Sequence, residues 1–297
     1  MAEQTAMAVC QGCIDLHAHS TASDGSFTPS ELVKLASFVG LSALALTDHD
    51  TVSGCQEAMD TARSIDFNLV PGVEISCDYD KFSLHILGYY IDYEHPPLIE
   101  TLTQLKKFRS DRNLLLIDKL RELGIDIDYA EVKLLAGEDV VGRPHFAMAL
   151  VQKGIVSTTQ EAFDKYLAKG KPAYIDKKRL TAEEGVKLIR DAKGVPVLAH
   201  PGEYKFLQPK ELRKFLEDLI PHGLAGMEVW YSTHSEQLSA EYLKLTEELG
   251  LIATGGSDFH GRSKPNIGLG TGIDNNLDLS SLVLDNLKQR RKEIHGA

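Results

Sequence analysis

Residues 43–50 read Ala-Leu-Ala-Leu-Thr-Asp-His-Asp, an apolar run that ends abruptly in ionisable side chains. The four apolar residues predict a buried strand over Ala43–Leu46. Ionisable groups where a buried strand ends cost free energy unless they are paired or bind a metal ion. Barrels of parallel strands keep their catalytic groups at this end of each strand. The stretch therefore predicts a parallel sheet with a site at one edge, a solvated aspartate turn being the alternative.

Similar apolar segments alternate with amphipathic helical patterns along much of the chain. Residues 28–31, Thr-Pro-Ser-Glu, predict a helix start with a capping box. Further strands are predicted at residues 13–16, 69–75, 82–89, 195–199, 226–230 and 251–254. The alternation predicts an α/β fold with a parallel sheet, and 297 residues suffice for one large barrel or two ordinary domains.

One long stretch breaks this alternation. From residue 98 to residue 178 the pattern is almost wholly helical, with periodic apolar positions at 114–123, 146–151 and 162–167. We interpret residues 98–178 as a helical subdomain, a cap, inserted into a barrel formed by residues 13–97 and 179–297.

Charge and composition exclude several classes of partner. The formal net charge is −11 and the sequence pI is about 5.5, which argues against binding long DNA through its phosphates. A small anionic substrate remains compatible, because bound metal ions can invert the local field. The sequence shows no apolar run of membrane-spanning length and no secretion signal. The four cysteines do not suggest a disulfide framework. We expect a cytoplasmic protein with reduced thiols and no membrane partner; the oligomeric state is left open.

Two short motifs place metal-binding side chains two residues apart. On a strand, residues i and i+2 point to the same face, so His17 and His19 project together. Asp258 and His260 repeat this spacing after another apolar segment. Paired imidazoles of this kind are typical of metal sites. Half-buried histidines at a strand end are the alternative for either pair taken alone.

The remaining candidates follow or lie within other predicted strands. Glu74 ends one strand, and His200 ends another. His85 lies inside a strand, where a lone histidine is usually a satisfied core residue, so it counts little by itself. Nearly every predicted strand nevertheless ends in a residue that can bind a metal ion. This recurrence predicts a metal site at the carboxyl ends of the strands.

These motifs resemble the PHP (polymerase and histidinol phosphatase) family, phosphoesterases related to the amidohydrolases. The resemblance is carried by the strand with His85 and by residues 15–25 (DLHAHSTASDG), 47–51 (TDHDT), 72–76 (GVEIS), 198–202 (LAHPG) and 256–260 (GSDFH). It implies a distorted (β/α)7 TIM-like barrel with the inserted helical subdomain. It also implies two or three divalent metal ions, with manganese as the first choice and zinc or iron(II) as alternatives.

Carried onto this chain, the resemblance implies nine metal ligands: His17, His19, Asp24, His49, Glu74, His85, His200, Asp258 and His260. Glu74 is implied to bridge ions, with His17, His19 and Asp258 around one of them and His49 and His200 at the others. Many members carry a histidine where this chain has Asp24. Aspartate there resembles the nucleotide phosphatase subgroup.

The helical stretch narrows the resemblance further. Residues 142–145 (GRPH) and 170–174 (GKPAY) are similar to members that hydrolyse nucleoside 3′,5′-bisphosphates, some of which also trim short RNA from the 5′ end. Arg143 offers a bidentate fork for a phosphate, and Lys171 offers a point charge. An ordinary helix start or surface solvation is the alternative for both. His234 is a further candidate substrate contact.

The resemblance thus implies a phosphoric ester hydrolase that removes the 3′-phosphate of nucleoside 3′,5′-bisphosphates by a metal-activated hydroxide, and trims short RNA. Asp258 would orient the nucleophile, and Arg143 would neutralise phosphoryl charge. Either His200 or a metal-bound water would protonate the leaving oxygen. The expected partner is a small nucleotide or short RNA. Three alternatives stay open: a histidinol-phosphate phosphatase, an exonuclease module attached to a polymerase, and a non-catalytic metal-binding regulatory domain.

Overall fold

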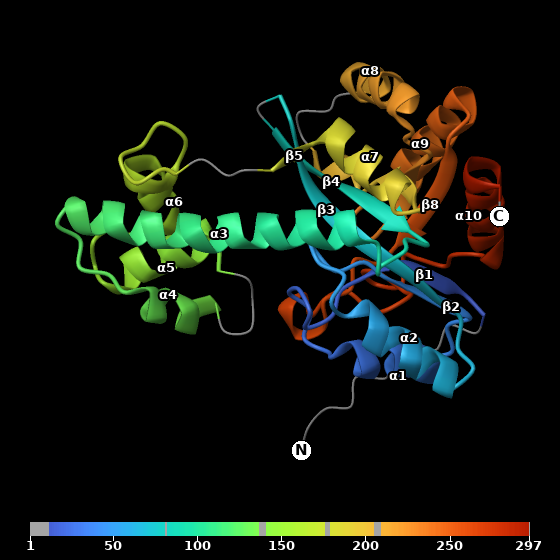
Figure 1. Ribbon diagram of the computed structural model, residues 1–297, viewed down its shortest axis with the longest axis horizontal. Helices are drawn as coiled ribbons and strands as arrows, with labels where there is room; N and C mark the ends of the chain where they lie inside the picture. The colour runs from blue at the N-terminus through green and yellow to red at the C-terminus, as the bar shows by residue number, and fades with distance from the viewer. Residues whose placement is uncertain (1–11, 81, 137–140, 176–178, 205–208, 297) are drawn as a thin grey trace. The chain divides into compact units, whose positions relative to one another are not determined.

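The computed structural model of the chain describes residues 12–80, 82–136, 141–175, 179–204 and 209–296. The chain folds into two compact units (Figure 1). The first is Met1–Glu100 with Leu180–Ala297, and the second is Thr101–Arg179. That residues 98–178 cap the barrel remains a prediction.

A single mixed sheet forms the centre of the first unit. Its strands are β1 (Ile14–Ala18), β2 (Ala43–Leu46), β3 (Leu69–Tyr79), β4 (Phe82–Tyr89), β5 (Leu180–Thr181), β6 (Val195–Leu198), β7 (Gly226–Tyr231) and β8 (Ile252–Gly256). Neighbouring strands follow the order β1-β2-β3-β4-β6-β7-β8, and the short β5 pairs with β3. β1, β2 and β6 are buried along their whole length, and β7 and β8 at every position but one, which explains the largely apolar character of these strands.

The two ends of the sheet meet at β8 and β1. The backbone N–H of Asp258 donates to the carbonyl of His17 at 2.8 Å, and Ala18 bridges to Phe259 in a parallel sense. Gly256 makes this approach possible, because a Cβ atom there would lie 2.3 Å from the Cβ of His17. The sheet is therefore a nearly closed barrel, which confirms the predicted α/β barrel fold.

One strand departs from the expected parallel arrangement. β4 runs antiparallel to both β3 and β6. Tyr79 pairs with Phe82, so β3 and β4 are joined by a two-residue connection. Parallel neighbours need a crossover of about a dozen residues or more, so a connection this short forces the antiparallel pairing. The prediction of a wholly parallel sheet was wrong for this strand.

Amphipathic helices surround the barrel: α1 (Pro29–Phe38), α2 (Cys55–Ser64), α7 (Ala182–Asp191), α8 (Pro209–Leu219), α9 (Glu236–Leu249) and α10 (Ser281–His295). Three short 3₁₀ turns join them, η2 (Pro201–Glu203), η3 (Ile220–His222) and η4 (Gly261–Ser263). α1 begins with the predicted capping box, in which Thr28 and Glu31 each accept a hydrogen bond from the other's backbone N–H.

The described residues of the second unit, 101–136, 141–175 and 179, form helices joined by turns and loops and contain no strand. α3 (Pro96–Glu122) leads into it from the barrel. The rest consists of α4 (Tyr129–Ala136), α5 (Arg143–Gln152), α6 (Thr159–Ala162) and a π-helical turn, η1 (Phe163–Leu167). Buried side chains such as Leu116, Phe146, Leu150 and Leu167 form a separate core within this unit. The absence of strands from these residues agrees with the sequence pattern.

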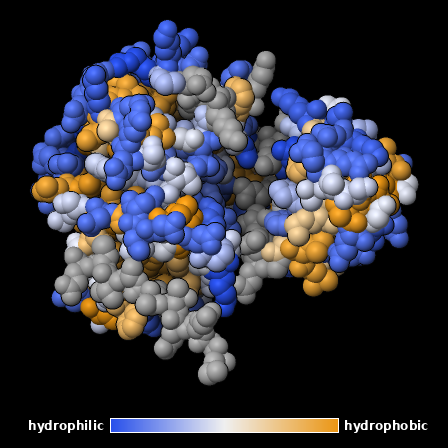
Figure 2. Space-filling model, turned by 180° about the vertical axis from the view of Figure 1, so that it is seen from behind, coloured by the Kyte–Doolittle hydropathy of each residue, from blue (hydrophilic) through white to orange (hydrophobic). Residues whose placement is uncertain are grey.

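The surface and the cysteines bear on the expected environment. Within the described residues, none of the helices combines the length and the apolarity that a membrane crossing needs. On the face seen in Figure 2, apolar residues lie scattered among hydrophilic ones. Cys55 and Cys77 are buried free thiols. Cys13 is disulfide-bonded, so the expectation that every thiol is reduced was wrong for this residue.

Substituting Gly256 with alanine should destabilise the barrel at the contact between β8 and β1. The added methyl group would overlap His17, and such overpacking costs about 1–3 kcal/mol in free energy of unfolding. Urea unfolding followed by circular dichroism measures the loss. The control is Gly250→Ala, where a Cβ meets nothing within 4 Å and only the positive φ of 67° opposes alanine. An equal or smaller loss in Gly256→Ala would contradict the tight approach.

Candidate metal centre

Seven of the nine predicted ligands lie where a barrel strand ends. His17 is in β1 and His19 directly follows it, while His49 follows β2 and His200 follows β6. Asp24 lies in the loop after β1, and Asp258 and His260 lie in the loop after β8. Glu74 and His85 lie inside the paired strands β3 and β4, two register positions apart. The barrel thus brings all nine residues to one end of the sheet.

Eight of the nine side chains, all but His200, divide into overlapping groups whose ligand atoms lie within 4.8 Å of one another. The first group is His17, His19, Glu74 and Asp258; the second is His49, Glu74 and His85; the third is His19, Asp24, His49 and His260. Each group combines imidazole nitrogens with a carboxylate oxygen. These groups match the ligands that divalent transition metals take in proteins.

Glu74 is common to the first two groups. Its Oε2 lies 3.2 Å from Nε2 of His17, 3.2 Å from Nε2 of His19 and 3.0 Å from Nδ1 of His49. Its Oε1 lies 2.8 Å from Nδ1 of His85 and 2.9 Å from Nε2 of His200. The two oxygens of one carboxylate therefore face two different sets of nitrogens, as the bridging role implied by the family resemblance requires. Nε2 of His200 also lies 3.3 Å from Nδ1 of His85, so His200 lies beside two members of the second group.

The electrostatics of these groups follow from burial and from this carboxylate. Burial lowers the pKa of His49, to about 3. Burial opposes protonation of His19 as well, but the carboxylates of Asp258 and Glu74 beside its Nε2 raise its pKa to about 9. In the same way Glu228, Glu74 and Asp258 raise the pKa of His17 against its burial. The neighbouring histidines hold the pKa of Glu74 well below its usual value, although burial alone would raise it.

Several ligand atoms point at one another without a hydrogen bond. Nε2 of His19 and Nδ1 of His49 are buried and, among the described residues, have no partner of suitable hydrogen-bond geometry. Each nonetheless lies within 3.2 Å of a Glu74 oxygen. Buried polar atoms are seldom left this way in proteins. Imidazole nitrogens and carboxylate oxygens that converge in this way fit a divalent ion, so the residues present fit the implied metals.

Three of the loops that carry ligands contain a residue with a positive φ angle. The φ angles of Asp50, His200 and Asp258 are 51°, 27° and 59°. Residues other than glycine rarely occupy this region of backbone conformation. Each backbone N–H is held by a hydrogen bond: Asp50 to the carbonyl of Glu74, His200 to the carboxylate of Glu228, and Asp258 to the carbonyl of His17. These bonds hold the loops in the turns that aim the ligands inward.

Some residues that support the ligands were missed by sequence reasoning. Oδ2 of Asp258 accepts hydrogen bonds from the hydroxyl of Tyr231 at 2.8 Å and from Nζ of Lys264 at 2.6 Å. Its Oδ1 is the oxygen that faces Nε2 of His19, at 3.1 Å. Glu228, in β7, contacts Nδ1 of His17 at 3.0 Å. The sequence signal for Glu228 is its position inside an apolar strand, where a carboxylate needs a partner.

The predicted phosphate-binding residues lie in the second unit. Arg143 is the first residue of α5, and its Nη1 donates to the carbonyl of Leu167 at 3.1 Å. Its guanidinium lies over the ring of Tyr174, 5.2 Å from the centroid. A guanidinium carries five donors, so this bond leaves others for a phosphate. Lys171 is exposed. Their approach to the metal ligands remains a prediction.

His234 occupies a different environment from the one expected of a substrate contact. The side chain is buried, and its Nδ1 lies 2.9 Å from the carbonyl of Val229. Its Nε2 accepts a hydrogen bond from the N–H of Gly202 at 3.2 Å. Both ring nitrogens are therefore bonded to backbone. His234 supports the loop that carries His200, and its contact with substrate remains a prediction.

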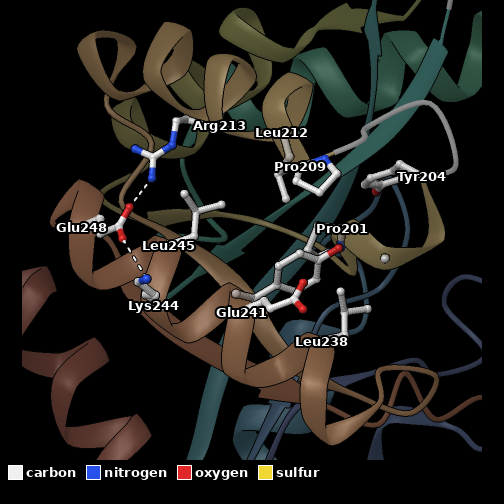
Figure 3. A pocket seen from close by; sticks show the side chains of 12 residues that line it. Pro201, Tyr204, Pro209, Leu212, Arg213, Leu238, Glu241, Lys244, Leu245 and Glu248 are labelled. Atoms are coloured by element: carbon white, nitrogen blue, oxygen red, sulfur yellow. Dashed lines mark hydrogen bonds and ion pairs between the residues drawn. The ribbon is translucent and has the colours of Figure 1, made fainter.

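A pocket of about 420 Å³ lies beside the same loop (Figure 3). Its lining includes Pro201, Gly202 and Tyr204 from the loop, Leu212 from α8 and Leu238 from α9. None of the nine predicted ligands lines it. At one end Glu248 forms ion pairs with Arg213 and Lys244. The pocket is thus distinct from the metal groups, although Pro201 in its wall directly follows the predicted ligand His200.

An α/β barrel with grouped histidines and carboxylates at one end of its strands defines the chain as a metal-dependent phosphoesterase, a hydrolase of phosphoric esters. Residues 15–219 match the PHP domain family. The chain belongs to this family, as the sequence motifs predicted.

Individual relatives agree with this class. A 5′-3′ exoribonuclease of Haemophilus influenzae is 37% identical over 246 residues, which are 83% of this chain and 89% of the relative. A 3′,5′-nucleoside bisphosphate phosphatase of Chromobacterium violaceum is 32% identical over 255 residues, 83% of this chain and 87% of the relative. Among solved structures, a candidate metal-dependent phosphoesterase of Bifidobacterium adolescentis matches with a TM-score of 0.73 and 29% identity, covering 94% of this chain and 96% of that one.

The raised pKa of His19, about 9, makes metal binding depend on pH. At neutral pH its imidazole is protonated in the metal-free protein, so an incoming ion must displace that proton. The affinity for Mn²⁺ should therefore rise from pH 6.5 to pH 8.5, by up to about tenfold per unit for each proton displaced. Isothermal titration calorimetry in two buffers of different ionisation enthalpy measures both affinity and proton release. A constant affinity without proton release would contradict this prediction.

Proposed function

We propose that this chain hydrolyses the 3′-phosphate of nucleoside 3′,5′-bisphosphates and also trims short RNA from its 5′ end. The observation that carries the proposal is the convergence of the ligand groups on Glu74, which supports two adjacent ions of the kind used in phosphoryl transfer. The exoribonuclease of Haemophilus influenzae and the nucleoside bisphosphate phosphatase of Chromobacterium violaceum support the choice of nucleotide substrates.

The proposed cofactor is two or three divalent ions, with Mn²⁺ as the first choice and Zn²⁺ or Fe²⁺ as alternatives. His17, His19, Glu74 and Asp258 would hold one ion, and His49, Glu74, His85 and His200 a second. His19, Asp24, His49 and His260 would hold the third. Bound ions of this kind supply Lewis-acid stabilisation of phosphoryl oxygens and lower the pKa of a water molecule.

The side chains direct the reaction. The oxygen of a water molecule bonds to phosphorus as the bond from phosphorus to the 3′-oxygen breaks, and a proton passes to that leaving oxygen. The products are inorganic phosphate and a nucleoside 5′-monophosphate. Oδ1 of Asp258 faces the ligand groups, so it would accept a hydrogen bond from the attacking water and fix its direction. Nε2 of His200 lies 2.9 Å from Oε1 of Glu74, and its role as proton donor remains a prediction.

Arg143 and Lys171 would bind the second phosphate. The guanidinium provides parallel donors for two phosphate oxygens, and the ammonium provides a point charge. Binding energy from a non-reacting phosphate raises the rate only where it positions the reacting one. This requirement would favour a bisphosphate over a simple monoester.

The substrate is tested by measuring phosphate release, with Mn²⁺ added, from adenosine 3′,5′-bisphosphate, AMP, histidinol phosphate and a 5′-phosphorylated short RNA. We expect kcat/KM for the bisphosphate to exceed that for AMP by at least about tenfold, the value of one lost charge-assisted contact. Preference for histidinol phosphate would overturn the nucleotide proposal but leave the metal groups intact. No turnover of any ester would favour a non-catalytic domain.

The division between metal and phosphate residues is tested with two variants. His17→Ala should abolish turnover and lower the bound metal measured by inductively coupled plasma mass spectrometry, because it removes a ligand atom. Arg143→Ala should leave the metal content unchanged and raise KM for the bisphosphate about tenfold or more. Lys169→Ala, which removes another exposed cation of the second unit, is the control for net charge. Full activity in His17→Ala would contradict the assignment of His17 as a metal ligand.

A further inference from the structure

Glu228 is a fully buried carboxylate on the opposite side of His17 from Glu74. Its Oε1 lies 3.0 Å and its Oε2 3.3 Å from Nδ1 of His17. Its Oε2 also accepts the backbone N–H of His200 at 2.7 Å. One side chain therefore contacts a ligand of the first metal group through the ring and a ligand of the second through the backbone.

The contact with His17 fixes where the imidazole carries its proton. A carboxylate beside Nδ1 can only accept, so that nitrogen must carry hydrogen. The lone pair is then left on Nε2, which faces Glu74 at 3.2 Å and belongs to the first ligand group. A carboxylate behind a ligating histidine is a recurrent means of fixing its tautomer and ring orientation.

The contact with His200 holds a strained backbone. His200 has φ 27° and ψ 60°, outside the regions that residues with a side chain prefer. Its N–H is buried and finds its partner in the Glu228 carboxylate. Without that acceptor the N–H would lose a hydrogen bond, and the turn that brings Nε2 of His200 to 2.9 Å from Glu74 would lose a restraint.

We propose that Glu228 is a positioning residue that prepares both metal groups for binding, by fixing the tautomer of His17 and the backbone of His200 at once. It would bind no ion itself, because its two oxygens face Nδ1 of His17 and the backbone N–H of His200. It belongs to none of the three ligand groups. The inference rests on the proposed metal sites but not on the proposed substrate.

Glu228→Gln separates this role from simple space filling, because glutamine has nearly the same shape and one acceptor oxygen instead of two. If the amide NH₂ faces His17, it donates to Nδ1 and moves the ring proton to Nε2, where it blocks the metal. If the NH₂ faces His200 instead, two donors oppose each other and the N–H is left unsatisfied. Either orientation damages one of the two groups.

The test is Mn²⁺ binding by isothermal titration calorimetry without substrate, together with the metal content of the protein. We expect Glu228→Gln to raise the Kd for Mn²⁺ by about 10–100-fold. Excess Mn²⁺ should partly restore turnover, since the ligands themselves remain. Glu228→Asp keeps the charge but is one methylene too short to reach both partners, so it should also bind Mn²⁺ weakly.

Glu241→Gln, on the exposed side of α9, makes the same chemical change away from the barrel and should bind Mn²⁺ as the unaltered chain does. A folded Glu228→Gln protein with a Kd within twofold of the unaltered chain would overturn the proposal. Failure of both Glu228 variants to fold, judged by circular dichroism, would also overturn it by assigning Glu228 to barrel stability. Failure of the substrate panel alone would instead remove the proposed function and leave this result standing.

Discussion

The buried carboxylate of Glu74 is the constraint on which the site depends. The side chain is fully buried, and removing an unpaired carboxylate from water costs several kcal/mol or more. Five imidazole nitrogens within 3.2 Å offset that cost, and they come from β1, β4 and the loops after β1, β2 and β6. The carboxylate can therefore be accommodated only when the barrel has closed and brought these distant segments together.

The site therefore forms its geometry only when the barrel closes. The N–H groups of Asp50, His200 and Asp258 each donate to a residue of another strand, and each belongs to a turn with a positive φ angle. Such turns cost roughly 1–3 kcal/mol each when nothing else holds them. Here hydrogen bonds to neighbouring strands hold the turns, so the protein's own contacts fix the orientation of the ligand loops. This preorganisation is what metal sites and phosphoryl transfer require.

The sequence predicted the parts of this arrangement that depend on local pattern. Buried strands ending in ionisable residues, and the i, i+2 spacing of His17 with His19, follow from strand geometry alone. β4 followed a different rule: its short connection to β3 reverses its direction, so His85 reaches the site from within a strand rather than from its end. For that reason the histidine carried little weight by itself, although its Nδ1 lies 2.8 Å from Glu74.

The two glutamates beside His17 show why the rest lay beyond local reasoning. Glu74 follows Gly-Val and Glu228 follows Gly-Met, each inside an apolar strand, so their sequence surroundings are nearly alike. Both contact the same imidazole, Glu74 at Nε2 and Glu228 at Nδ1. They differ in what else meets their oxygens: four further histidines for Glu74, and a backbone N–H for Glu228. That difference is set by strand pairing across the barrel, and it separates a carboxylate able to bridge metal ions from one that orients a ligand.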